Sequence, residues 1–379
     1  MSNEHPIRRN NVSFQPVISA ARPGKGKKDK NVPRPAPLGS GSWPLGSHSW
    51  PLGAHSGPLG ESGTIPLGSG SWPLGDGSWW LGGTRKEVGL GYHPDLPDIR
   101  DKDKKHLSEE VRLFINKSKK SALGSYLLRT KKGNLPYRIN LGDKGKMPPV
   151  EDQGKLNSCT ANAVIGLVEY LIKASNTDDL DFSRLFLYRT TRRLLGWAGD
   201  TGAYLRTTIK AMALFGVPPE SEWPYLAELL DLDPDAYLYS YAQNFKAMIY
   251  ARLDGYGMHG DDILQAVKQT IADGFPIAFG FPVYRSIENM GPDFVIPLPV
   301  ENQIDKLIGG HAVLAVGYDD SIICANQEKP GALIVRNSWG TTWGDMGYGY
   351  LPFDYVRKEM ALDFWTIFQQ DWLNLEQFE

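Results

Sequence analysis

The clearest periodic pattern in the chain follows Cys159. Apolar residues recur after it at the spacing of one helix face, at Ala161, Val164, Ile165, Val168, Leu171 and Ile172. This spacing predicts a helix over residues 159–174 that begins at the cysteine. Comparable patterns predict helices over residues 184–195, 204–215 and 261–273.

The later part of the chain changes to short, continuous apolar runs, which are typical of buried strands. These runs are Phe275–Phe281, Ala312–Tyr318, Ala332–Arg336, Gly347–Leu351 and Phe364–Phe368. Residues 220–225 contain a proline and two glutamates and are expected to form a loop. Helices followed by strands predict an α+β fold with two lobes that begins near Leu135.

The first quarter of the chain has no domain-like patterning. Residues 1–36 are polar and basic, and too few of them are apolar to offset an ordering cost of about 1–2 kcal/mol per residue, so we expect disorder. Residues 37–83 repeat the unit Trp-Pro-Leu-Gly-Ser-x-Ser. Pro-Leu-Gly begins at residues 37, 44, 51, 58, 66 and 73, and Trp80-Leu81-Gly82 is a degenerate seventh copy.

Proline and glycine in the repeat exclude a helix, and therefore a coiled coil, which leaves turns or extended segments. We interpret the repeat as a flexible low-complexity tether, with a docking motif or a set of cleavage sites as alternatives. Residues 84–134 follow the repeat. They contain Pro-Asp-Leu-Pro-Asp and a helical pattern over residues 108–121, with Ser108 as the expected N-cap.

Charge is distributed unevenly over a chain whose formal net charge is only −2. Residues 1–134 carry 21 Lys and Arg against 11 Asp and Glu, whereas residues 135–379 carry 20 against 32. The basic N-terminal region could dock on the acidic remainder through long-range attraction, or it could be a solvated tail. No nucleic-acid-binding motif accompanies the charge, so nucleic acid is not an expected partner.

Only two cysteines occur, Cys159 and Cys324, so a disulfide framework cannot form without using both. The chain starts without the apolar core of a secretory signal, and it contains no run of about 18 apolar residues. These features predict a soluble, cytoplasmic protein that does not enter a membrane, with non-classical export left open. Cys324 has no motif around it and is expected to be buried and unreactive.

Cys159 is placed where a thiol loses its proton easily, because backbone N–H groups and the helix dipole at a helix start favour a thiolate. The dipole alone lowers a thiol pKa of about 8.5 by only about one unit, so a cationic partner is needed. The sequence offers His311 at the start of one predicted strand and Asn337 at the end of another, while Gln153 precedes the cysteine. His259 lies in a glycine-rich loop and is expected at the surface.

Glutamine, cysteine, histidine and asparagine in this order resemble the papain-like cysteine peptidases, whose motifs are Q-G-x-C-G-S-C, H-A-V-x-x-V-G-Y and N-S-W-G. The matching segments are Gln153–Cys159, His311–Tyr318 and Asn337–Gly340. The resemblance runs from about Leu135, which is similar to the family's mature start, to the C-terminus. Residues 94–101 and 158–162 are most similar to the bacterial-type branch without disulfides.

The resemblance implies a role for each of these residues. Cys159 would be the nucleophile, and His311 would be the general base and acid that holds the thiolate as an ion pair. Asn337 would accept the ring N–H of His311, and Trp339 would shield that hydrogen bond from water. Gln153 would stabilise the oxyanion together with the backbone N–H of Cys159. No metal or cofactor is expected.

A peptide or protein substrate would lie extended along Gly202 and Ala203, where the family usually has two glycines. Gly310 and Ala312 would flank the main specificity pocket, and their small size leaves room for an apolar or aromatic side chain.

Other departures from the family pattern concern the surroundings of the thiol. Asn157 and Thr160 replace the family's glycine and tryptophan and are expected to narrow the approach to the sulfur. The cysteine and histidine are 152 residues apart. This is slightly more than the roughly 130–150 typical of the family. An acidic, tyrosine-rich insertion over residues 226–244 would account for the difference and would rim the cleft.

The resulting hypothesis is a cysteine endopeptidase or aminopeptidase with the papain-like two-lobe fold, which cuts peptide bonds through an acyl-enzyme thioester. Residues 84–134 would form a propeptide-like segment that lies in the cleft in the reverse direction to substrate and restrains the enzyme. Two alternatives stay open. One is acyl transfer by a transpeptidase or ligase on the same fold, and the other is a non-catalytic binding protein that presents the repeat to a partner.

Overall fold

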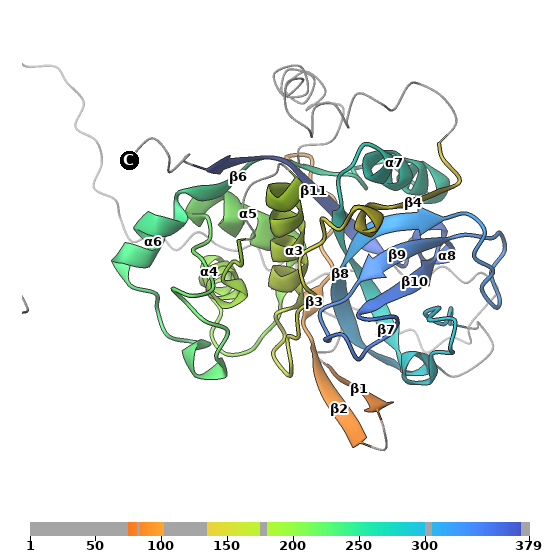
Figure 1. Cartoon of the computed structure of the whole chain (residues 1–379), viewed down its shortest axis with the longest axis horizontal. Coiled ribbons are helices and arrows are strands. Elements are labelled where there is room, and N and C mark those ends of the chain that lie inside the picture. The colour runs from red at the N-terminus through yellow and green to blue at the C-terminus, as the bar shows by residue number, and fades with distance from the viewer. Residues whose placement is uncertain (1–74, 82–83, 102–134, 175–179, 300–304, 373–379) are drawn as a thin grey trace, which may run out of the picture. The chain divides into compact units, whose positions relative to one another are not determined.

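The computed structural model describes residues 75–81, 84–101, 135–174, 180–299 and 305–372 (Figure 1). The tail expected over residues 1–36, most of the repeat segment and the helix expected over residues 108–121 lie outside these ranges. No helix in the described ranges is long and apolar enough to cross a membrane.

One lobe consists of helices that pack around α3, Cys159–Ala174. This helix is buried from Cys159 to Ile172, because it packs against the sheet and against both α4 (Arg184–Leu195) and α5 (Leu205–Phe215). Ser183 caps α4 by accepting the N–H of Phe186, as expected for a serine at a helix start. All three helices lie within one residue of the bounds that the sequence predicts.

The insertion over residues 226–244 belongs to the helical lobe. It forms the 3-10 helix η3, Ala227–Leu229, and the short helix α6, Ala236–Ala242, neither of which the sequence predicts. Its acidic side chains bind arginines of α4. Arg192 Nη1 lies 2.7 Å from Asp231 Oδ1, and Arg189 Nη2 lies 2.7 Å from Asp233 Oδ1.

The other lobe is built on a seven-stranded antiparallel sheet with the order β10-β9-β8-β7-β11-β6, and β4 pairs with β8. The strands are β4 (Arg138–Asn140), β6 (Phe245–Arg252), β7 (Ile277–Tyr284), β8 (Leu307–Asp319), β9 (Ala332–Arg336), β10 (Tyr348–Pro352) and β11 (Leu362–Trp372). Helices α7 (Gly260–Ala272) and α8 (Asp354–Arg357) pack on this lobe, which also contains the 3-10 helices η2 (Leu141–Lys144) and η4 (Arg285–Asn289). The sequence predicts β7 to β11 near these bounds and misses β4 and β6. The expected two-lobe α+β fold is confirmed.

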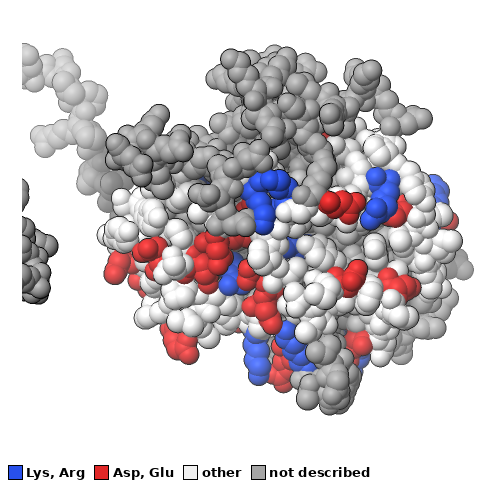
Figure 2. Space-filling view, in the orientation of Figure 1, with Lys and Arg blue, Asp and Glu red and all other residues white. Residues whose placement is uncertain are grey.

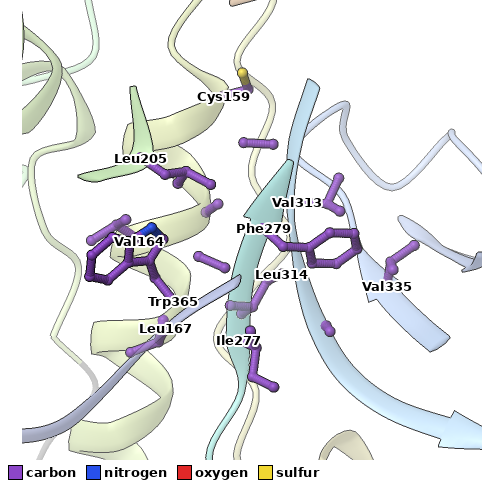
Figure 3. Packing of buried hydrophobic residues seen from close by; sticks show 14 of the residues in the cluster. Cys159, Val164, Leu167, Leu205, Ile277, Phe279, Val313, Leu314, Val335 and Trp365 are labelled. Carbon is purple, nitrogen blue, oxygen red and sulfur yellow. The ribbon is translucent and has the colours of Figure 1, made fainter. Parts of the chain in front are cut away.

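The hydrophobic core lies where α3 meets the sheet. Figure 3 shows Val164 and Leu167 of α3 close to Leu205 and Trp365, with Phe279 of β7 on the sheet side. All of these side chains are buried. Cys159 lies at the end of α3 above this cluster, so close packing of the helix on the sheet fixes the position of its sulfur.

The N-terminal part of the described chain passes between the two lobes. Strands β1 (Gly75–Leu81) and β2 (Thr84–Leu90) form an antiparallel hairpin, and β1 contains the start of the degenerate repeat copy. The chain then enters β3 (Tyr92–His93), which pairs in parallel with β5 (Ala203–Tyr204). Figure 1 shows β3 between α3 and the strands β7 and β8, and β3 contacts both strands. We call residues 84–101 the strap.

Candidate active site

Cys159 is the first residue of α3, and its side chain is 0% exposed. Backbone N–H groups of Ala312, Gly91 and Thr160 lie near enough to the sulfur to favour its charged form. Ala312 belongs to β8 and Gly91 to the strap, while Thr160 is the next residue of α3. Both lobes and the strap therefore enclose the sulfur.

His311 lies on β8 immediately before Ala312 and is also fully buried. Its Nε2 lies 2.7 Å from Asn337 Oδ1. Trp339 stacks on the imidazole, with the ring centroids 4.3 Å apart. The Nδ1 atom of His311 makes no hydrogen bond within the described part of the chain. With Nε2 bound to Asn337, Nδ1 is the nitrogen left for proton exchange with the thiol.

Burial changes the protonation of both reactive groups. It raises the pKa of the Cys159 thiol to about 11, although the neighbouring N–H groups act in the opposite direction. Burial also lowers the pKa of His311 to about 4, and the bond to Asn337 only partly offsets this. The sequence predicts a thiolate held by a charged imidazole. In this covered site, burial instead favours the neutral thiol and the neutral imidazole.

Gln153 is held by three hydrogen bonds beside the cysteine. Its Oε1 accepts from Ser338 Oγ at 2.6 Å. Its Nε2 donates to the backbone oxygen of Leu156 at 2.8 Å and to that of Gly89, in the strap, at 3.1 Å. The side-chain amide of Gln153, which is expected to bind a substrate oxyanion, therefore already donates to the carbonyl of Gly89 in the strap.

The strap backbone lies unusually close to the loop that precedes α3. The N–H of Leu90 donates to Asn157 Oδ1 at 2.9 Å, and the carbonyl of Gly91 accepts the N–H of Ala203 at 2.8 Å. A Cβ atom on Gly91 would lie 1.9 Å from the backbone oxygen of Asn157. Only glycine permits this approach.

Strap side chains make contacts on both sides of the sulfur. In the part of the strap that precedes Gly91, Lys86 Nζ lies 2.7 Å from Asp152 Oδ2 and 2.9 Å from the backbone oxygen of Trp339. Immediately after Gly91, Tyr92 is buried and donates its hydroxyl hydrogen to Asp363 Oδ2 at 2.6 Å. His93 Nε2 lies 2.8 Å from the backbone oxygen of Thr201.

Two arginines hold the end of the strap. Arg206 of α5 makes a two-pronged contact with Asp101, at 2.8 Å from Nε to Oδ1 and 2.7 Å from Nη2 to Oδ2, and it also binds Asp95. Arg252 of β6 donates from Nη2 to the backbone oxygen of Asp95 at 2.9 Å. The strap is thus fixed to the helical lobe by Arg206 and to the sheet lobe by Arg252.

Comparison with known proteins assigns the family. A family model described as papain family cysteine protease matches residues 135–360. The chain belongs to the papain family of cysteine proteases. It is therefore a member of an enzyme family of peptide-bond hydrolases, and the cysteine and histidine motifs that the sequence singles out lie within the matched region.

Three papain-family relatives illustrate the match. An uncharacterized peptidase C1-like protein of Acanthamoeba polyphaga mimivirus is 35% identical over 288 residues, which are 73% of this chain and 86% of that protein. The structure of xylellain, a cysteine protease from Xylella fastidiosa, has 33% identity and a TM-score of 0.57, covering 77% of this chain and 98% of that one. Papain of Carica papaya is 27% identical over 222 residues, 57% of this chain and 54% of papain.

The residues expected to bind substrate in this papain-family chain surround the strap. Ala203 pairs with Tyr92, and Gly202 adopts a left-handed conformation with φ 74° before it. On the other side, Ala312 lies opposite Gly280 in the pairing of β7 with β8, and Gly310 lies opposite Pro282. Among the described residues, no group of three or more His, Cys, Asp or Glu could hold a metal ion.

The departures from the family pattern have different structural roles. Asn157 binds the strap through Leu90, and its own N–H donates to Asp200 at 3.0 Å. The expectation that Thr160 narrows the approach to the thiol is wrong, because its side chain is buried inside the helical lobe and accepts from Thr208 Oγ1 at 3.1 Å. His259 is exposed, as expected, and Cys324 is buried.

Sequence reasoning missed several residues that shape the site, above all Gly91, Tyr92, Arg206, Arg252 and Asp363. The glycines on either side of Leu90 are the one local signal of a close backbone approach. The acidic residues between 95 and 101 could not be matched to their arginines, because those partners lie more than 100 residues away along the chain.

Proposed function

We propose that this protein hydrolyses peptide bonds through an acyl-enzyme thioester on Cys159, and that the strap holds it in an inactive, zymogen-like state. The observation that carries the proposal is the path of the strap over the sulfur. The strap places the N–H of Gly91 near the sulfur, whereas the carbonyl of the following peptide bond, Gly91–Tyr92, accepts the N–H of Ala203. The Gly91–Tyr92 peptide bond is therefore held with its carbonyl turned away from the thiol.

In the uncovered enzyme, His311 would take the thiol proton through Nδ1 while Asn337 fixes the ring through Nε2. The sulfur would attack the scissile carbonyl, and the oxyanion would receive hydrogen bonds from Gln153 and from the backbone N–H of Cys159. His311 would then protonate the leaving amine. Water would release the acyl group from the thioester and regenerate the thiol.

The strap opposes this reaction in two ways. It excludes water from the thiol and the imidazole, so neither group is stabilised in its charged form. It also places the carbonyl of Gly89 on the amide of Gln153. Displacing the strap would admit water and substrate together, and the ion pair could then form.

We further propose that the basic N-terminal region assists this restraint by docking on the acidic helical lobe. Figure 2 shows Asp and Glu side chains gathered over the side that carries α4 and α6. The exposed acidic residues there are Glu222, Glu228, Asp231, Asp233 and Asp235. Deleting residues 1–36, which carry 8 Lys and Arg, should raise activity at low salt and have little effect at about 1 M salt, where the Debye length is about 3 Å. Equal activity with and without the deletion at low salt would refute the docking.

The proposed hydrolysis can be tested in the full-length chain with Gly91→Ala, which makes the close approach of the strap impossible. We expect this variant to cleave a fluorogenic peptide faster than the parent chain, and the double variant with Cys159→Ala to be inactive. The matched control is Ile99→Ala, since Ile99 lies in the same strap but is 90% exposed. A folded Gly91→Ala protein that cleaves nothing, and whose Cys159 does not react with an epoxide directed at papain-like thiols, would refute the proposal.

The same reaction distinguishes hydrolysis from acyl transfer. An added amine acceptor should leave the products of a hydrolase unchanged in mass. Products extended by the amine would instead assign the transpeptidase or ligase activity, with the same thioester as its intermediate.

A further inference from the structure

The side chain of Tyr92 fills a slot next to the reactive sulfur. The residue is 1% exposed, and its ring packs closely against Gly280 in β7. A Cβ atom on Gly280 would lie 2.0 Å from the Cζ atom of Tyr92, so the slot exists because residue 280 has no side chain. At its far end, the tyrosine hydroxyl donates to Asp363 Oδ2 at 2.6 Å.

The floor of the slot is a buried pair of opposite charges. Asp363 is 0% exposed, and its Oδ1 lies 2.9 Å from Arg252 Nη1. Asp254 binds both members of this pair. It accepts a hydrogen bond from Arg252 Nε at 3.1 Å, and it accepts from the backbone N–H groups of Asp363 and Phe364 at 2.8 and 2.9 Å. These bonds point Asp363 Oδ2 into the slot. All partners of Asp363 Oδ2 that the structure describes come from the strap, namely the Tyr92 hydroxyl and the N–H of Asp95 at 2.8 Å.

The slot is in register with the reaction centre. The N–H of Gly91 lies near the sulfur, and the next residue, Tyr92, pairs with Ala203 and places its side chain in the slot. An extended substrate lying on Ala203 with one residue at the sulfur would place the side chain of the neighbouring residue there. The strap is expected to run in the reverse direction to substrate, so Tyr92, which follows Gly91 in the strap, corresponds to the second residue before the scissile bond in a substrate.

We propose that the slot selects tyrosine at this substrate position and that Asp363 is the residue that determines the selection. This inference rests on the proposed peptidase function and adds a substrate class to it. Once the strap leaves, Asp363 Oδ2 faces the open slot without its two donors. A substrate tyrosine restores one of them, whereas phenylalanine or leucine would bury the carboxylate unsatisfied.

The same floor disfavours basic side chains. A lysine or arginine in the slot would bring a second cation next to Arg252, which already lies 2.9 Å from Asp363. A neutral donor satisfies the carboxylate without this repulsion. A hydrogen bond to a buried charged acceptor then corresponds to a preference for tyrosine over phenylalanine of about 10- to 100-fold in kcat/KM.

The first test measures recognition of the hydroxyl group without catalysis. In the full-length chain, Tyr92→Phe should raise the rate at which iodoacetamide alkylates Cys159 by about 10- to 100-fold, because the strap opens more often. Ile99→Ala, the exposed strap control, should leave the rate unchanged. In the presence of Asp363→Ala, the change Tyr92→Phe should have no further effect, since the acceptor is already gone. Equal alkylation rates for the parent chain and the Tyr92→Phe variant, both with Asp363 intact, would overturn the proposal.

The second test needs no change at Asp363, whose replacement could prevent folding. Full-length protein with Gly91→Ala is given peptides that differ only at the second residue before the scissile bond, with tyrosine, phenylalanine, leucine or arginine there. We expect the tyrosine peptide to have a lower KM and a higher kcat/KM than the other three peptides. Equal cleavage of the tyrosine and phenylalanine peptides, or faster cleavage of the arginine peptide, would overturn the selection while leaving the peptidase intact. Failure to cleave any of them would overturn the peptidase and, with it, the substrate preference.

Discussion

Replacing Arg206 tests how strongly the end of the strap closes the site. Its guanidinium contacts Asp95 and Asp101, and the side chains of these three residues are only 11%, 25% and 8% exposed. Removing one partner of a buried ion pair costs about 3–5 kcal/mol, because the remaining charge is left without compensation. Arg252 still reaches Asp101 at 3.6 Å and the backbone oxygen of Asp95, so we expect about 2–3 kcal/mol for Arg206→Ala. Strap opening should then be about 30- to 150-fold more frequent.

Alkylation of the two cysteines gives the assay. Iodoacetamide reaches Cys159 only when the strap opens, and peptide mass spectrometry separates its modification from that of Cys324. Cys324 is buried in the loop that joins β8 to β9, so it serves as an internal reference for opening of the chain away from the strap. We expect the rate at Cys159 to rise by the factor above while the rate at Cys324 stays constant.

Arg193→Ala is the matched control for this prediction. Arg193 also pairs with an aspartate, Asp233 at 3.2 Å, but both side chains are more than half exposed. Such a pair contributes about 0–1 kcal/mol, and it is not part of the strap contacts, so alkylation of Cys159 should stay within about twofold of the parent rate. The reasoning fails if Arg206→Ala behaves like this control, or if both cysteines become reactive together.

Three further substitutions test other parts of the site. Gln153→Ala, in the Gly91→Ala protein, should lower kcat by about 10²–10³ with little change in KM, and an unchanged kcat would remove this residue from the oxyanion site. Gly280→Ala should expel Tyr92 from the slot, because the added methyl group overpacks it by about 1–3 kcal/mol. The rate at which Cys159 is alkylated should then rise by about 5- to 150-fold. A rate equal to that of the parent chain would show that the slot can adapt. Burial raises the pKa of Glu169 from 4.5 to about 8, so its contribution to stability is full below about pH 4.5 and is lost as the pH rises to about 8. Glu169→Gln should therefore match the parent Tm near pH 4.5 and exceed it at pH 9, and parallel Tm curves would contradict this assignment.

The local pattern of apolar residues was sufficient to predict a helix or strand wherever that element buries one continuous face. The apolar spacing after Cys159 predicts α3 with its observed bounds, because this helix is buried along almost its whole length. The apolar run that ends at Arg336 predicts β9 for the same reason. Strand β6 was missed because lysine and arginine interrupt its apolar pattern. Arg252 at its end is a buried charge that is compensated by Asp254, two residues away, and by the distant Asp363.

Candidate reactive residues could be named from the sequence, whereas their environment could not. A resemblance in four separated motifs identifies Cys159, His311, Asn337 and Gln153, which the fold brings to one place. Their protonation depends on the strap, whose contacts join residues 90 and 157, 92 and 363, and 101 and 206. Such contacts have no periodic signal, because each consists of one leucine N–H group, one tyrosine or one aspartate with a partner far along the chain. For this reason the sequence predicted a charged pair where the covered structure favours a neutral one.

Under the proposed restraint, the distribution of the strap contacts also determines what activation requires. Lys86 binds on one side of the sulfur, Tyr92 fills the slot, and Asp95 and Asp101 bind arginines from both lobes. A cut between residues 102 and 134 would break none of these contacts. It would only remove the covalent link that keeps the strap at a high effective concentration, so release would then depend on dilution or on competition by substrate. Because a substrate tyrosine would compete for the slot that Tyr92 fills, the strap contact that closes the site is also the one that the preferred substrate would replace.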